Sequence, residues 1–171
     1  MRFFLKNNKG FSLLEMILVV AIFVIILSSV VGLLGDKTVR EDLSAKAQEV
    51  VNIISRAHDY AVNSYYGDNW GVKILDASTD CYTDGSSGDC LIIFKGKSYD
   101  SRSSDYDEKV LLDTSVFIDS DQTNEFYFQR ISGWLSTTTG ALAEQAIILQ
   151  TNLGSQKIVT TTPTGLVYYG D

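Results

Sequence analysis

The amino-acid sequence predicts an α+β protein in which one long N-terminal helix is followed by an antiparallel β-sheet domain. Two observations predict the helix: an apolar run from Met16 to Leu34, and a helical repeat of apolar residues from Asp36 to Ser64. A third predicts the sheet, because the chain beyond Ser64 changes to short strand-like segments separated by Gly, Ser, Asp and Asn. With 171 residues, the chain is long enough for one such domain besides its N-terminal segment.

The apolar run is long enough to cross a membrane as a helix. No polar side chain occurs between Met16 and Leu27, and only two serines and a glycine interrupt the run before Leu34. At the standard helical rise the run spans roughly 28 Å, close to the ~30 Å hydrocarbon core of a bilayer. A helix pairs its backbone groups internally, as lipid requires. We therefore predict a membrane-spanning helix over residues 11–35.

The segment before the run is basic, with Arg2, Lys6 and Lys9. This charge keeps the N-terminus cytoplasmic and places everything after Leu34 outside. A cleaved secretory signal fits poorly, because the run is too long and no Ala-x-Ala site follows it. A plain signal anchor fits the hydropathy, but it leaves an acidic residue at the head of the run, Glu15, unexplained.

The order of residues at the head of the run is specific: Lys9-Gly10-Phe11-Ser12-Leu13-Leu14-Glu15-Met16. It resembles the class III signal of type IV pilins and type II secretion pseudopilins. The resemblance implies that residues 1–10 are a prepilin leader, that a membrane-bound prepilin peptidase cleaves after Gly10, and that Phe11 becomes an N-methylphenylalanine. It also implies that Glu15 pairs with the terminal amine of a neighbouring subunit during filament assembly.

The physical chemistry of Glu15 agrees with that role. A carboxylate at membrane depth costs a few kcal/mol and usually has a cationic partner. A buried carboxylate and a buried ammonium are tolerable together, so the pair can set the register between subunits. Taken alone, Glu15 fits equally well at the headgroup level, where it reaches water.

Residues 36–64 are predicted to continue the helix as an amphipathic segment that packs on a β-rich domain over residues 65–171. Apolar residues recur there at spacings of three and four. They are Val39, Leu43, Ala47, Val50, Ile54, Ala57 and Ala61. Gly32 and Gly35 are the expected soft points of the helix. His58, the single histidine, is expected at a partly exposed polar position, since no second histidine exists to form a relay or metal site with it.

The β-rich region contains eight segments with strand character. They are Trp70 to Leu75, Leu91 to Lys95, Lys109 to Leu112, Val116 to Ile118, Glu125 to Gln129, Ala146 to Gln150, Lys157 to Thr161 and Leu166 to Tyr169. Phe126 and Phe128 alternate with Tyr127, so one aromatic face is expected to meet the core. Two polar stretches, Ser101 to Ser104 and Ser136 to Gly140, are expected to be exposed, mobile loops.

The order of elements resembles the GspH/FimT group of minor pilins more than the major pilins. The local resemblances are Ala57 to Ser64 at the helix end, Trp70 to Lys73, Phe126 to Phe128 followed by Gly133, and Lys157 to Val159 with Thr164 to Val167.

Cys81 and Cys90 are the only cysteines, and the residues between them are rich in Gly, Ser and Asp. Such a stretch can turn the chain back on itself, and the domain is expected on the oxidising side of the membrane. We therefore expect a disulfide. A zinc site is disfavoured because no second pair of cysteines and no nearby histidine is present.

The region from Asp36 to Asp171 is acidic, with 20 acidic and 11 basic residues. Nucleic acid is an improbable partner for it, because phosphate binding depends on Lys and Arg, and the nearest approach to a basic cluster is Lys95-Gly96-Lys97. Acids gather around the cysteine loop and in two later stretches: Asp76, Asp80, Asp84 and Asp89; Asp100, Asp105, Asp107 and Glu108; Asp119 and Asp121. Calcium is the alternative reading, but no EF-hand spacing occurs, so we expect solvated surface acids and no cofactor.

No catalytic motif is found: neither Gly-x-Ser-x-Gly, nor a P-loop, nor His-Glu-x-x-His. The sequence therefore predicts a structural protein rather than an enzyme. The resemblance implies an inner-membrane prepilin with its C-terminal domain outside. This precursor would assemble with other pilin or pseudopilin subunits, on an inner-membrane assembly platform, into a periplasmic or extracellular filament. As a minor subunit, it would prime or cap that filament. The alternatives are a minor pilin whose domain binds DNA or a surface, and an anchored domain that never assembles.

Overall fold

The structure is a computed structural model that describes residues 12–78, 81, 88–112, 116–119, 124–137, 139–140 and 144–170, with the backbone alone at 29–38 and 76–78. The chain divides into two compact units, Met1–Val39 and Arg40–Asp171. Gly10 and Phe11, the predicted processing residues, lie outside the described residues.

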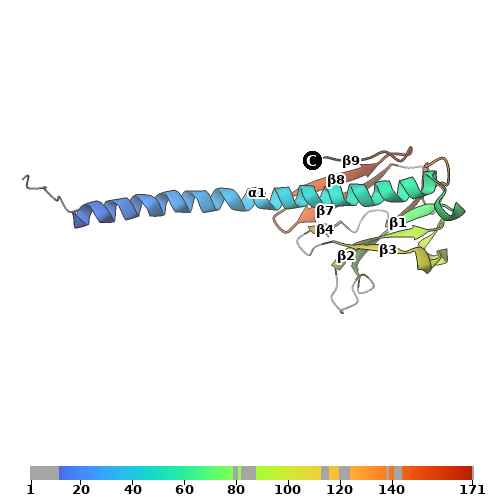
Figure 1. Ribbon diagram of the computed structural model, residues 1–171, viewed down its shortest axis with the longest axis horizontal. Helices are drawn as coiled ribbons and strands as arrows, with labels where there is room; N and C mark the ends of the chain where they lie inside the picture. The colour runs from blue at the N-terminus through green and yellow to red at the C-terminus, as the bar shows by residue number, and fades with distance from the viewer. Residues whose placement is uncertain are drawn as a thin grey trace, which may run out of the picture. The chain divides into compact units, whose positions relative to one another are not determined.

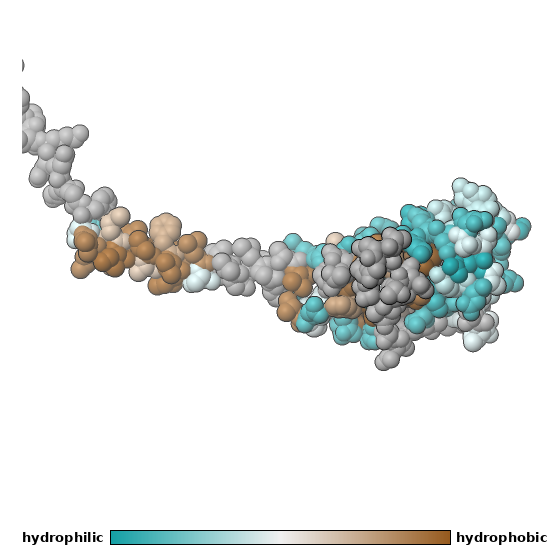
Figure 2. Space-filling model, turned by 90° about the horizontal axis from the view of Figure 1, so that it is seen from below, coloured by the Kyte–Doolittle hydropathy of each residue, from teal (hydrophilic) through white to brown (hydrophobic). Residues whose placement is uncertain are grey.

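The long N-terminal helix predicted from the sequence is present as α1, Leu13–Val62, with 50 residues (Figure 1). In the first unit, every large apolar side chain described from Leu13 to Leu27 is exposed, by 42% or more. Figure 2 shows these apolar residues in brown along the helix. Within the described residues, no helix meets the length and hydropathy needed to span a membrane. The spanning helix over 11–35 stays a prediction.

In the second unit, α1 buries the stripe that its sequence predicts. Leu43 is 1% exposed, and Ala47, Val50, Ile54, Ala57 and Ala61 are completely buried. They join one cluster with strand residues such as Val72, Phe126 and Leu149. Val39, the last residue of the first unit and the first of the predicted stripe, is half-buried rather than buried. A 3.6-residue period keeps these positions on one face, and that face meets the sheets.

Two antiparallel sheets form the rest of the unit (Figure 1). The first has the strand order β3-β2-β1-β5-β6, built from Glu108–Leu111, Gly88–Lys95, Trp70–Ser78, Glu125–Phe128 and Leu135–Thr137. The second has the order β4-β7-β8-β9, built from Val116–Ile118, Gln145–Thr151, Gln156–Thr161 and Val167–Gly170. The described residues also form short 3-10 turns: η1 (Tyr65–Gly67) lies between α1 and β1, and η2 (Tyr99–Ser101) and η3 (Ser104–Tyr106) lie between β2 and β3. The α+β fold class is thereby confirmed.

The strands bury alternate residues, as half-buried antiparallel strands do. Phe126 and Phe128 are completely buried, whereas Tyr127 between them is only half-buried, as predicted. β2 and β6 depart from this alternation: Leu91 to Phe94 of β2 are all buried, as are the three residues of β6. The segment after β2 covers its second face, where the Tyr99 ring packs edge-on against Phe94 at 5.8 Å.

Two expectations from the sequence are wrong. The stretch from Ser136 was expected to be an exposed loop, but Ser136 and Thr137 belong to β6 and are 1% and 7% exposed. β6 pairs with β5, and the Leu135 N–H also donates to the Pro163 carbonyl at 2.9 Å. A three-residue strand with two polar members has no periodic signal of its own, so its partners alone define it.

Asp89 was expected to be a solvated surface acid, and it is 6% exposed in β2. Its Oδ2 accepts the Ile118 N–H at 2.6 Å. Because β2 and β4 belong to different sheets, this hydrogen bond joins the two sheets. A buried carboxylate is tolerated where it is hydrogen-bonded in this way.

Candidate assembly motif and domain pocket

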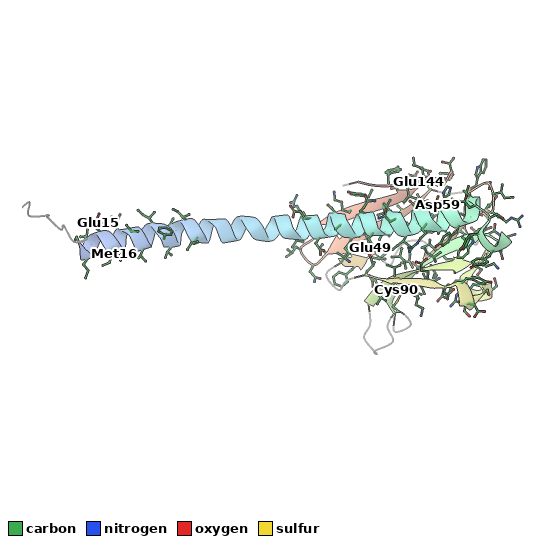
Figure 3. The ribbon with its side chains drawn as sticks, in the orientation of Figure 1. Glu15, Met16, Glu49, Asp59, Cys90 and Glu144 are labelled. Atoms are coloured by element: carbon green, nitrogen blue, oxygen red, sulfur yellow. A yellow bond between two sulfur atoms is a disulfide. The ribbon has the colours of Figure 1, made fainter. Side chains whose placement is uncertain are left out.

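The head of α1 positions Glu15. The Ser12 Oγ accepts the Leu14 N–H at 3.3 Å, and the Ser12 carbonyl accepts the Met16 N–H at 3.2 Å, so Ser12 acts as the helix cap. Glu15 lies in the first turn, where the helix dipole favours a negative charge. Figure 3 shows Glu15 and Met16 at this end of the helix.

Glu15 is exposed and its neighbours Leu14 and Met16 are exposed by 72% and 58%. Among the described residues, no cation forms an ion pair with this carboxylate. The first turn therefore presents one acidic group in an apolar setting. Such a group can take a cationic partner from another chain.

Cys81 and Cys90 form a disulfide, with a Cα–Cα distance of 5.9 Å (Cys90 is labelled in Figure 3). The bridge packs with Ile92 in a small apolar cluster, against which Leu75 and Tyr99 also pack. It ties the start of β2 to the segment that follows β1.

In the part of the chain that the structure describes, no three His, Cys, Asp or Glu side chains gather as metal ligands. Asp80, Asp84 and Asp121 lie outside the described residues, as does the side chain of Asp76.

His58 is partly exposed, at 24% of its side chain, and it has a packing role that the sequence did not reveal. Its ring meets the Phe128 ring edge-on at 5.3 Å. Gly133 and Gly165 lie directly against it: a Cβ at Gly133 would lie 2.5 Å, and one at Gly165 2.2 Å, from an atom of the imidazole. His58 thereby holds two turns of the β-rich unit close to the end of α1.

An aromatic cluster surrounds the η1 turn. Tyr66 lies 4.6 Å from both Tyr65 and Tyr106, centroid to centroid. Electrostatic repulsion between the Tyr65 and Tyr66 phenolates raises the pKa of Tyr66 above its usual value, so this phenol ionises only at a more alkaline pH than a free tyrosine does. The Lys95 Nζ lies 4.6 Å above the Tyr106 ring. Lys95 is therefore engaged by this cluster.

A hollow of about 340 Å³ lies nearby, and we call it the Lys97 pocket. It is lined by Asn69, Lys97, Tyr127, Gln129 and Arg130. Sequence reasoning missed it, because its residues come from three separated segments. The pairings Gly71↔Phe94 and Gly71↔Tyr127 bring those segments together. The one signal in the sequence was the pair of lysines in Lys95-Gly96-Lys97.

Comparison with known families gives one match: the prokaryotic N-terminal methylation motif, over residues 5–31. No curated protein and no solved structure matches the chain. The matched residues include Gly10, Phe11, Glu15 and the first part of the apolar run.

The chain thus carries the signature of type IV pilins and pseudopilins. More particularly, the motif is of the kind that prepilin peptidase recognises in type IV pilin-like proteins. The match covers the N-terminal signature and does not extend into the β-rich unit.

Proposed function

We propose that this protein is a minor pilin or pseudopilin subunit that assembles through α1 into a type IV pilus or a type II secretion pseudopilus. The observation that carries the proposal is the matched methylation motif, with Glu15 in the first turn of an apolar helix. The two antiparallel sheets that follow α1 support a GspH/FimT-like domain, and with it a position at filament initiation or at the tip.

Before assembly, we propose that the chain crosses the inner membrane once, with its β-rich unit outside. The apolar side chains from Leu13 to Leu27 are exposed on all sides of the helix, and such a helix is stable only where lipid or other helices cover it. The basic leader sets the orientation. In the filament, the helices of neighbouring subunits replace the lipid.

Glu15 makes this replacement of lipid by neighbouring helices specific for one axial register of the subunits. A carboxylate at membrane depth costs roughly 3 kcal/mol on insertion scales, and a cationic partner removes most of that cost. Once the leader is removed after Gly10, the new amine at Phe11 is such a cation. A neighbouring subunit that presents this amine to Glu15 is held in one axial register. The role is structural, so we expect no enzymatic activity and no cofactor.

Processing and assembly are tested separately in a cell that has a prepilin peptidase and a filament machine. The wild-type chain is expected to begin at methylated Phe11, as peptide mass spectrometry of the membrane fraction reports. A chain that still begins at Met1 would contradict the proposal at its first step.

The assembly step is tested with Glu15→Ala and with Glu41→Ala, a matched change of an exposed acid further along α1. Both variants are expected to be processed and membrane-bound. Glu15→Ala is expected to disappear from the sheared filament fraction, whereas Glu41→Ala remains there at the wild-type level. If Glu15→Ala assembles normally, the pairing role of Glu15 is wrong. If the wild-type chain is itself absent from the filament fraction, the protein is an anchored domain that does not assemble.

A further inference from the structure

The Lys97 pocket is a polar surface hollow with a volume large enough for a small molecule. Its volume of about 340 Å³ falls at the lower end of the range of roughly 300–1,000 Å³ that is typical of ligand pockets. Asn69 precedes β1, Lys97 follows β2, and Tyr127 to Arg130 end β5. The pocket is therefore built on the ends of three paired strands, which hold its lining groups in place.

The charge of the lining is opposite to that of the domain. The chain has a formal charge of −7, yet the two charged side chains of the pocket, Lys97 and Arg130, are both cationic. Neither forms an ion pair with any residue that the structure describes. Two cations without a carboxylate partner favour an anionic ligand.

The remaining lining groups suit hydroxyl groups. Tyr127 contributes an aromatic ring with a phenol to the lining, and the Gln129 amide provides both donors and an acceptor. The Asn69 Oδ1 is occupied by the Arg130 N–H at 2.9 Å, so Asn69 positions Arg130 more than it serves the ligand. An anion beside neutral donors, acceptors and an aromatic face matches a sugar ring that carries an acidic group.

Two turns close in sequence to the pocket residues Asn69 and Arg130 have unusual backbone conformations. In the described part of the chain, the non-glycine residues with positive φ are Ser64 (54°), Tyr66 (52°) and Ile131 (71°). The Arg130 Nη1 donates to the Gly67 carbonyl at 2.7 Å and so connects the turn of Ser64 and Tyr66 to the turn of Ile131. Such backbone strain persists only where the surroundings enforce it, and it gathers at ligand sites. The guanidinium is therefore pre-positioned, which lowers the entropic cost of binding.

From this lining we propose that the Lys97 pocket binds an anionic sugar, with its carboxylate or phosphate between Lys97 and Arg130 and its ring beside Tyr127. A nucleic-acid strand fits less well, because it needs a row of cations along its phosphates, and the pocket provides two in an acidic domain. The proposal goes beyond filament assembly and does not depend on it, since the binding assay uses the unassembled chain.

The test is calorimetric titration of the full chain in zwitterionic detergent, at low salt, with glucuronate, glucose 6-phosphate and glucose. At least one of the two anionic sugars is expected to bind, with a dissociation constant of about 1 mM, and the neutral sugar at least tenfold more weakly. Binding of glucuronate alone identifies a carboxylate ligand, and binding of glucose 6-phosphate alone identifies a phosphate ligand. Equal binding of all three sugars, or of none, would overturn the proposal.

Three variants locate the site. Lys97→Gln removes an exposed cation and is expected to weaken binding by roughly tenfold or more. Tyr127→Phe removes only the hydroxyl and is expected to weaken binding less. Lys157→Gln, on β8 of the other sheet, is the matched control and should bind as the wild type does.

If Lys97→Gln binds the sugar normally, the site is elsewhere and the proposal is wrong. If single-stranded DNA binds more tightly than either sugar, and if Lys97→Gln weakens the binding of DNA, the ligand of the pocket is nucleic acid. This result would also overturn the proposal.

Discussion

Gly71 is the residue at which the two β1 pairings in the first sheet leave no room for a side chain. It lies opposite Phe94 of β2 and opposite Tyr127 of β5. A Cβ at this position would lie 2.3 Å from the Phe94 Cζ and 2.8 Å from the Phe126 carbonyl oxygen. Phe94 is completely buried and the oxygen belongs to a paired strand, so neither can move without disturbing its neighbours. Glycine within a strand commonly marks such a close approach.

We therefore predict that Gly71→Ala destabilises the β-rich unit. Overpacking a core costs about 1–3 kcal/mol, and the lower backbone entropy of the unfolded alanine chain offsets up to about 1 kcal/mol of it. The net loss of unfolding free energy is then about 1–2 kcal/mol. This loss corresponds to a decrease in Tm of roughly 4–8 °C for a unit of this size.

The assay is urea unfolding of the full chain in detergent, followed by tryptophan fluorescence. Both tryptophans, Trp70 and Trp134, lie in the β-rich unit, so the signal reports that unit. Gly170→Ala is the matched control, because no atom lies within 4 Å of the Cβ it would add. The control is expected to stay within about 0.5 kcal/mol of the wild type. Equal stability of the two variants would refute the close approach at Gly71.

Three further changes are expected to lower stability. Asp89→Ala leaves the Ile118 N–H unpaired and should cost about 1–3 kcal/mol, measured by urea unfolding, whereas Asp89→Asn keeps an acceptor and should cost less. Replacing Cys81 and Cys90 by Ser removes a cross-link with a sequence separation of 9, which should cost about 2–3 kcal/mol in the same assay; an unchanged midpoint would contradict this. Ile54→Ala, at a completely buried position, should lower the free energy of unfolding, measured by thermal unfolding, by about 2–5 kcal/mol. Asn52→Ala, at an exposed position on the same helix, should change it little.

Much of the fold could be predicted because its signals are local. The stripe from Leu43 to Ala61 repeats with the helical period, and the structure buries it. The eight strand-like segments correspond to β1 to β5 and β7 to β9, with ends that differ by up to three residues. The predicted assembly motif is local too, since Gly10, Phe11 and Glu15 lie close together in the sequence, and the methylation motif covers all three.

β6, by contrast, could not be predicted, because Leu135 to Thr137 form a strand only through β5 and Pro163. The sequence around Asp89 is as polar and acidic as that around the other acids of the cysteine loop, so it does not single out Asp89 as buried. Its hydrogen bond to Ile118 spans 29 positions of the chain and joins two sheets. His58 was identified as partly exposed, but its packing against Gly133 and Gly165 depends on turns that are remote in sequence.

The sequence by itself determined the long helix, its apolar first half, the acidic residue in its first turn and the succession of short strands. Each depends on residues a few positions apart, whose spacing defines a helix face or a strand face. Only the tertiary structure decided which strands pair, which acid is buried, and that Lys97 and Arg130 line one hollow beside Tyr127. These features depend on pairing between distant segments, and their energy comes from burial and hydrogen bonds that exist only once the sheets have formed.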